Sequence, residues 1–255
     1  MESVAKHIAF YYNESRINYL NRLIKEAESY TFTTDIFIHT HQSFEKSSLY
    51  PYTGKLEIIV HTFSPDEHPF LLPWKCRDLL KSQRDDYDIF MYVEDDILVP
   101  QIAIDYWLTH KDNVMFEECN LGFLRIETAD NKDYLSDLEG MKFPYRTTQI
   151  EDQTYLINET NTYCAFWIYD KKEFQRWTDS TYYDINNITG YDTRERSAIG
   201  LHGIRPPNGW YRYTLFPLVA HKSIDPACKI YHIPNNYVNN PMSLYATVLF
   251  DDCIM

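Results

Sequence analysis

Three consecutive carboxylates, Glu94, Asp95 and Asp96, follow the apolar run 89–93. An apolar run of this length between polar residues predicts a strand buried in a sheet. Three neighbouring acids repel one another unless a cation or solvent compensates their charge. Hard oxygen ligands suit Mg²⁺ or Mn²⁺, and such ions often also hold a substrate phosphate. The segment therefore predicts a metal site, and the alternative is an acidic turn in which Asp96 caps a helix that starts near Pro100.

Alternation along an extended segment assigns different roles to the three acids. It places Glu94 and Asp96 on one side of the chain, so we predict these two as metal ligands. Asp95 then faces the other way and is predicted to contact a hydroxyl of a ribose or another sugar. The carboxyl end of a strand is also where ligands bind in open α/β sheets.

Predicted strands and helices alternate in the first half of the chain. Apolar spacing predicts strands over 7–12, 35–39, 56–62, 89–93 and 121–126, and helices over 14–30, 73–84 and 100–110. This order is typical of an α/β fold with a mostly parallel central sheet flanked by helices. The second half is less regular, with a predicted strand over 162–169 and short helices over 171–178 and 192–200. Because no linker or repeat separates the halves, we predict a single domain over 1–255, with about 1–128 binding a nucleotide and about 129–255 an acceptor.

Composition excludes several classes of protein. A net charge of −13 argues against nucleic-acid binding, because phosphate backbones favour Lys and Arg clusters. With only 7 glycines, the chain has neither a G-x-G-x-x-G motif nor a P-loop, so a bound nucleotide would need a metal and side chains to hold its phosphates.

Location is predicted from the cysteines and from apolar runs. No run is long enough for a membrane span, and the N-terminus lacks the features of a signal peptide. The five cysteines are scattered and form no C-x-x-C pair, which is typical of reduced thiols. We therefore predict a cytoplasmic protein without a membrane span.

A buried strand ending in an acidic triplet, before an aromatic-rich second half, resembles a GT-A glycosyltransferase. In that fold the acidic motif holds Mn²⁺ or Mg²⁺ against the diphosphate of a sugar nucleotide. The segments 68–77, 87–100, 122–127 and 232–237 resemble GT-A-like proteins of algae and their large DNA viruses, including chlorella-virus enzymes that glycosylate the capsid. The resemblance covers about two-thirds of the chain. Cys76 departs from the histidine typical of that group, which leaves the metal motif unaffected.

Such a transferase needs further groups for catalysis and metal binding. An inverting enzyme requires a carboxylate base for the acceptor hydroxyl, whereas a retaining enzyme does not. If the segment 190–199 is helical, Asp192 and Glu195 share a face, so we predict Glu195 as the base and Asp192 as the second candidate. A solvated helix start with Asp192 near the N-cap is the alternative. The resemblance implies a third metal ligand from a C-terminal histidine, with His221 the first candidate and His232 the second, although a lone histidine is more often structural.

Residues near the first predicted strand are candidates for donor binding. Tyrosine rings can stack on a nucleobase and arginines can pair with phosphate. The candidates are Tyr11, Tyr12, Asn13, Arg16 and Arg77. Aromatic residues of the second half can pack on acceptor sugars or form core, namely Trp167, Trp210, Tyr211 and Tyr213. His39 and His41, at the end of the second predicted strand, are interpreted as local structure.

Together these features predict a metal-dependent glycosyltransferase that moves a sugar from a nucleotide-diphosphate donor to a glycan or glycoprotein. If the source is viral, as the resemblance implies, the reaction takes place in the host cytoplasm. A nucleotidyltransferase or phosphohydrolase using the same carboxylates is one alternative, and it would need a second carboxylate cluster for a second ion. A non-catalytic carbohydrate-binding protein is the other.

Overall fold

The computed structural model describes residues 2–116, 119–189, 191–201, 213–220 and 222–255. The chain divides into two units that alternate along the sequence. Unit 1 comprises Met1–Asp96 and Ala165–Gly200, and unit 2 comprises Ile97–Cys164 and Leu201–Met255. None of the three junctions between the units coincides with the predicted division near residue 128, because a strand from the second half of the chain joins the sheet formed by the first half.

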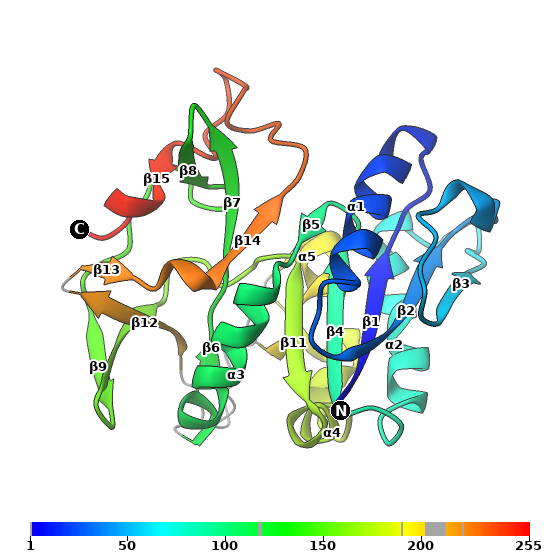
Figure 1. Ribbon diagram of the computed structural model, residues 1–255, viewed down its shortest axis with the longest axis horizontal. Coiled ribbons are helices and arrows are strands. Elements are labelled where there is room, and N and C mark those ends of the chain that lie inside the picture. Colours follow the sequence, from blue (N-terminus) through cyan, green and yellow to red (C-terminus); the bar gives the residue numbers. More distant parts are fainter. Residues whose placement is uncertain (1, 117–118, 190, 202–212, 221) are drawn as a thin grey trace. The chain divides into compact units, whose positions relative to one another are not determined.

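Unit 1 is built on a five-stranded sheet. Its strands lie in the order β11 (Phe166–Asp170), β4 (Ile89–Glu94), β1 (Ser3–Ala9), β2 (Thr33–Thr40) and β3 (Leu56–Val60) (Figure 1). The last four are mutually parallel, whereas β11 runs antiparallel to β4. The sheet of unit 1 is therefore mixed, and three of its four strand pairings are parallel.

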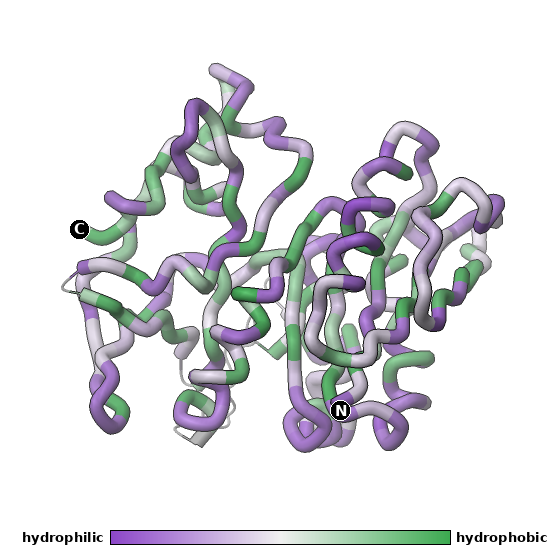
Figure 2. The backbone as a smooth tube through the Cα atoms, in the orientation of Figure 1, coloured by the Kyte–Doolittle hydropathy of each residue, from purple (hydrophilic) through white to green (hydrophobic). Residues whose placement is uncertain are grey.

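The strands and helices of unit 1 follow its apolar patterns. Every residue of β4 is buried, as expected for a strand covered on both faces, and the turn before it is hydrophilic (Figure 2). The helix α1 (Ile17–Ala27) buries Leu20, Leu23, Ile24 and Ala27, which form one stripe at helical spacing. The remaining helices are α2 (Leu72–Ser82), which has a proline in its first turn, α4 (Lys171–Thr178) and α5 (Thr193–Ala198).

Unit 2 has one long helix, α3 (Gln101–Phe116), and two mixed sheets. One sheet contains β13 (Ser223–Ile224), β12 (Thr214–Ala220), β10 (Gln153–Asn158), β9 (Thr147–Ile150) and β6 (Asn120–Leu121). The other contains β15 (Val248–Leu249), β8 (Lys132–Leu135), β7 (Leu124–Ala129), β14 (Lys229–His232) and β5 (Ile97–Leu98). Parallel and antiparallel pairs coexist in both sheets. The fold is therefore α/β with mixed sheets, and the expectation of a mostly parallel arrangement does not extend to the whole chain.

Short 3₁₀ helices connect these elements. They are η1 (Glu14–Arg16), η2 (Lys46–Ser48), η3 (Pro69–Leu71), η4 (Thr181–Tyr183), η5 (Ile185–Asn187), η7 (Pro226–Cys228) and η8 (Phe250–Asp252). In the part of the chain that the structure describes, no helix combines the length and apolar character needed to cross a membrane.

Aromatic rings fill the core of unit 1 between β4, β11 and α4. Phe90 stacks on Phe174 with ring centroids 4.1 Å apart, and Trp167 contacts Trp177 edge-to-face at 5.0 Å. Trp167, a candidate for acceptor binding in the sequence, is thus a core residue. Tyr213 lies in unit 2 near the Arg146 guanidinium, and Trp210 and Tyr211 lie outside the described residues.

Three histidines form a hydrogen-bonded chain across the parallel strands. His7 on β1 and His39 on β2 are fully buried, and their rings are joined by a contact of 2.8 Å between Nδ1 of His7 and Nε2 of His39. Nδ1 of His39 lies 2.7 Å from Nε2 of His61, and Nε2 of His7 lies 2.9 Å from Oε1 of Gln83. One tautomer arrangement of neutral rings satisfies every contact, with each Nε2 donating toward the Gln83 end. This chain satisfies polar groups that would otherwise be buried without partners.

The histidine chain is expected to make the protein acid-sensitive. Burial lowers the pKa of His7 to about 3, and burial together with the neighbouring histidines lowers the pKa of His39 well below its usual value. In the unfolded chain both protonate near pH 6.5, so the unfolded state binds more protons as the pH falls below that value. Each histidine should then remove about 1.4 kcal/mol of stability per pH unit. Urea denaturation between pH 7 and 4.5 measures this dependence of stability on pH. In His39→Leu, which lacks one of the two protons, the slope should be smaller by about 1.4 kcal/mol per pH unit. Equal slopes in the variant and the wild type would contradict the assignment.

Candidate functional site

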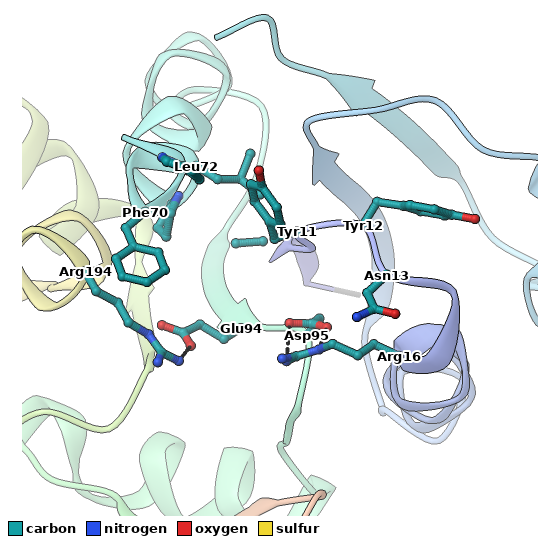
Figure 3. A pocket seen from close by; sticks show the side chains of 12 residues that line it. Tyr11, Tyr12, Asn13, Arg16, Phe70, Leu72, Glu94, Asp95 and Arg194 are labelled. Carbon is teal, nitrogen blue, oxygen red and sulfur yellow. Dashed lines mark hydrogen bonds and ion pairs between the residues drawn. The ribbon is translucent and has the colours of Figure 1, made fainter. Parts of the chain in front are cut away.

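A pocket of about 470 Å³ lies at the carboxyl end of the unit 1 sheet (Figure 3). Its walls come from the loop after β1, from η3 and the start of α2, from the end of β4 and from α5. The apolar side is formed by Phe70, Leu72 and two prolines, and the polar side by carboxylates and arginines. It therefore combines an apolar wall with a small number of charged groups, as small-molecule sites commonly do.

Parallel pairing of β1 with β4 brings the polar residues together. Ala9, at the end of β1, is opposite Glu94, at the end of β4. The Asp95 amide then donates to the Ala9 carbonyl at 3.2 Å. The loop that follows β1 and the acidic triplet that begins at the last residue of β4 consequently open at the same edge of the sheet, where ligands bind in such folds.

Arg16 compensates two of the three acids. Its Nε and Nη2 donate to the two carboxylate oxygens of Asp95 at 2.8 Å each, and Nη2 also reaches Asp96 at 2.7 Å. The loop before it is shaped by Asn13, whose side chain accepts from the Ser15 amide and hydroxyl. Arg16 and Asn13, both candidates for donor binding, thus line the pocket, and Arg16 is bound to carboxylates.

Arg194 compensates the third acid, and sequence reasoning missed it. Its Nη2 donates to Oε2 of Glu94 at 2.9 Å. In Figure 3, Arg194 and Arg16 approach the acids from opposite sides of the pocket. The only signal in the sequence was its place between the two predicted catalytic acids, Asp192 and Glu195. A basic residue in a short polar helix gives no indication of a distant carboxylate partner.

Two contacts hold α5 in place. The Ser197 hydroxyl donates to the Phe70 carbonyl in η3. The Arg77 guanidinium donates to the Ile199 carbonyl at 2.5 Å, just beyond the helix. These contacts bring Arg194 over the carboxyl end of β4.

Arg77 itself is buried and does not line the pocket. Its guanidinium stacks on the rings of Trp74 and Trp177, at 4.2 and 4.8 Å, and also donates to a backbone carbonyl of η4. Burial lowers its pKa to about 10. These surroundings indicate that Arg77 ties α2 to α5, and they give no support to the predicted contact with phosphate.

The acids do not alternate as the sequence analysis assumed. The strand β4 ends at Glu94, and Asp95 and Asp96 lie in the turn that follows. Glu94 and Asp95 line the pocket, whereas Asp96 is buried behind it on Arg16. Burial, followed by the charge of Asp96, raises the pKa of Asp95 to about 7 against the opposing effect of Arg16.

The donor set suits a hard divalent cation, because two carboxylates face one pocket. Each carboxylate is, however, paired with an arginine. Within the described ranges, no cluster of three or more His, Cys, Asp and Glu side chains is arranged to hold a metal ion. His221, the first candidate for a third ligand, lies outside the described residues. His232, the second, is buried in unit 2, where its Nδ1 contacts Glu127.

The predicted catalytic acids lie beside the pocket wall. Asp192 is at the N-cap position of α5, is exposed and makes no side-chain capping bond. Glu195 is partly buried, and its Oε2 has no hydrogen-bond partner among the described residues. Neither lines the pocket, so their roles stay predictions.

The two tyrosines of the loop after β1 form the rim. Tyr11 is 44% exposed and stacks on His41 with ring centroids 3.7 Å apart. His41 also accepts from the Tyr12 amide at 3.2 Å, so it positions both residues. Tyr12 further lines a neighbouring hollow of about 400 Å³ with Phe44. The Tyr11 ring is thus preorganised as a flat apolar surface at the pocket entrance.

No model of a known protein family matches this sequence, and no curated protein matches it either.

Replacing Arg16 should destabilise the fold and make it sensitive to cations. Arg16→Ala leaves Asp95 and Asp96 buried without their shared counterion. Because Arg16 is about a third exposed and partly screened by solvent, we expect a loss of about 2 kcal/mol. Urea denaturation measures it, with the exposed Arg22→Ala on α1 as the matched control. Added Mg²⁺ or Mn²⁺ should restore more stability to Arg16→Ala than to the control, and equal responses would argue against cation binding at these acids.

Proposed function

We propose that the protein is a glycosyltransferase of GT-A type that uses a divalent cation and a nucleotide-diphosphate sugar. The observation that carries the proposal is the pocket where Glu94 and Asp95 meet two arginines at the carboxyl ends of the parallel strands β1 and β4. Carboxylates suit a hard cation, and guanidinium groups suit phosphate oxygens. A diphosphate accompanied by an ion satisfies both kinds of group at once.

The residues then divide into three roles. Glu94 and a carboxylate of the following turn, Asp95 or Asp96, hold Mn²⁺ or Mg²⁺, which when bound stabilises the charge of the departing diphosphate. Arg16 and Arg194 orient the phosphates. Tyr11, with its ring held by His41, offers a stacking surface for the nucleobase.

Fewer observations support the roles that we propose toward the acceptor. A carboxylate base is needed if the reaction inverts the anomeric carbon, and Glu195 is the first candidate with Asp192 second. Of the two, Glu195 has the more buried side chain. The resemblance to chlorella-virus proteins suggests a glycan or glycoprotein acceptor, with capsid glycosylation as the process. Five buried, unbridged cysteines are in keeping with a cytoplasmic location.

A thermal-shift screen of UDP- and GDP-sugars, with and without Mn²⁺, tests the function. We expect one nucleotide sugar to stabilise the protein strongly only when the ion is present, because ion and diphosphate share the site. Glu94→Gln and Asp96→Ala should remove this effect and lower sugar transfer at least about 100-fold, whereas the exposed Asp66→Asn should change neither.

Other outcomes of the screen would point elsewhere. Stabilisation by nucleoside triphosphates in place of nucleotide sugars would favour a nucleotidyltransferase or phosphohydrolase. Binding of free glycans without any dependence on nucleotide or ion would favour a carbohydrate-binding protein. Full transfer activity in Asp96→Ala would contradict a role for this acid in metal binding.

A further inference from the structure

We propose that Arg194 is a displaceable counterion: it neutralises Glu94 before the donor arrives, and it moves to the diphosphate when a divalent cation takes its place on Glu94. The inference rests on the proposed function and adds the order of events at its site. It assigns a positioning role to a residue that no sequence motif singled out.

The ion pair is asymmetric in burial. The Glu94 side chain is 10% exposed and ends a strand that is paired on both sides, whereas the Arg194 side chain is 47% exposed. Glu94 therefore cannot follow a moving partner, while Arg194 already has much of its guanidinium surface in solvent. Because α5 itself is anchored through Ser197 and the Ile199 carbonyl, Arg194 moves from Glu94 into the pocket by rotation of its side chain.

Arg16 is not suited to the same movement. It makes three hydrogen bonds to two buried acids, and withdrawing it would leave both Asp95 and Asp96 without their shared cation. Withdrawing Arg194 uncovers one carboxylate, which faces the pocket and can be taken by an incoming cation. Of the two arginines, Arg194 is therefore the one that an ion displaces.

The charge of the pocket predicts how ion and diphosphate bind. With all three carboxylates ionised, the acids and the two arginines leave one net negative charge. A divalent cation alone makes the site positive and must displace Arg194 from the Glu94 carboxylate. A diphosphate alone adds about two negative charges to a site that is already negative. When both bind, their charges cancel and Arg194 gains phosphate oxygens in exchange for Glu94, so each ligand should strengthen binding of the other.

Removing Arg194 should change cation binding and diphosphate binding in opposite directions. In Arg194→Gln the Glu94 carboxylate loses its competitor, so the cation alone should bind more tightly. The diphosphate loses a guanidinium contact, so it should bind more weakly when the cation is present. A residue that only supports the fold would weaken both ligands together.

Isothermal titration calorimetry tests this with Mn²⁺ alone, with UDP and GDP alone, and with each nucleotide at saturating Mn²⁺. In the wild type, we expect Mn²⁺ and the preferred nucleotide to strengthen each other at least about 10-fold. In Arg194→Gln, we expect Mn²⁺ alone to bind about 5-fold tighter and the nucleotide with Mn²⁺ at least about 10-fold weaker. The affinities of Arg194→Lys for Mn²⁺ and for the nucleotide should lie between those of the wild type and Arg194→Gln, because lysine keeps the charge without the planar fork. Arg22→Gln should match the wild type.

The outcomes separate the inference from the function on which it rests. Cooperative binding in the wild type, with unchanged or weaker Mn²⁺ binding in Arg194→Gln, would overturn the displaceable counterion and leave the proposed function standing. If the wild type binds neither Mn²⁺ nor either nucleotide, the proposed function fails and this inference fails with it.

Discussion

Three neighbouring acids at the end of a buried strand require compensation, and the site is organised around this requirement. Glu94, Asp95 and Asp96 are all buried, so water cannot screen their mutual repulsion fully. Two arginines, one from the loop after β1 and one from α5, provide the opposing charge. The pairing of β1 with β4 brings the first within reach, and the contacts of α5 with η3 and Arg77 bring the second. Much of unit 1 therefore positions two guanidinium groups over one strand end.

Patterns local in sequence predicted the elements of unit 1 well. The apolar run before Glu94 predicted a buried strand, and the stripe beginning at Leu20 predicted α1. These two predictions succeed because burial and helical periodicity act over a few residues and leave a direct trace in residue type. Arg16 was a candidate for phosphate binding because it lies just inside the helix that follows the first predicted strand, and it lines the pocket.

Predictions that depended on tertiary contacts did less well. The side chains of the three acids do not alternate through Asp96, because the chain turns directly after Glu94. Nothing in three consecutive acids indicates where a strand ends. Arg77 was a plausible phosphate ligand by position, but its guanidinium contacts the Trp177 ring and the carbonyls of Tyr183 and Ile199, all from residues 100 or more positions away. Arg194 was missed for the same reason, since its partner is 100 residues distant. Some pairings in the mixed sheets of unit 2, such as β7 with β14 and β10 with β12, also join segments that are distant in sequence.

The use of arginine at both positions has a physical consequence for the site. A guanidinium is planar, weakly hydrated and able to contact two acceptors, so Arg16 can bridge Asp95 and Asp96 where a lysine ammonium would act as a point charge. The same geometry matches phosphate oxygens, which means that compensation of the empty pocket and recognition of an anion need the same chemical group. Burial, followed by the charge of Asp96, nevertheless raises the pKa of Asp95, so Arg16 offsets these two effects only in part. The two arginines also differ in exposure, because the side chain of Arg194 is 47% exposed and that of Arg16 is 35% exposed. Arg194 is therefore the guanidinium that is more accessible to an anion entering the pocket.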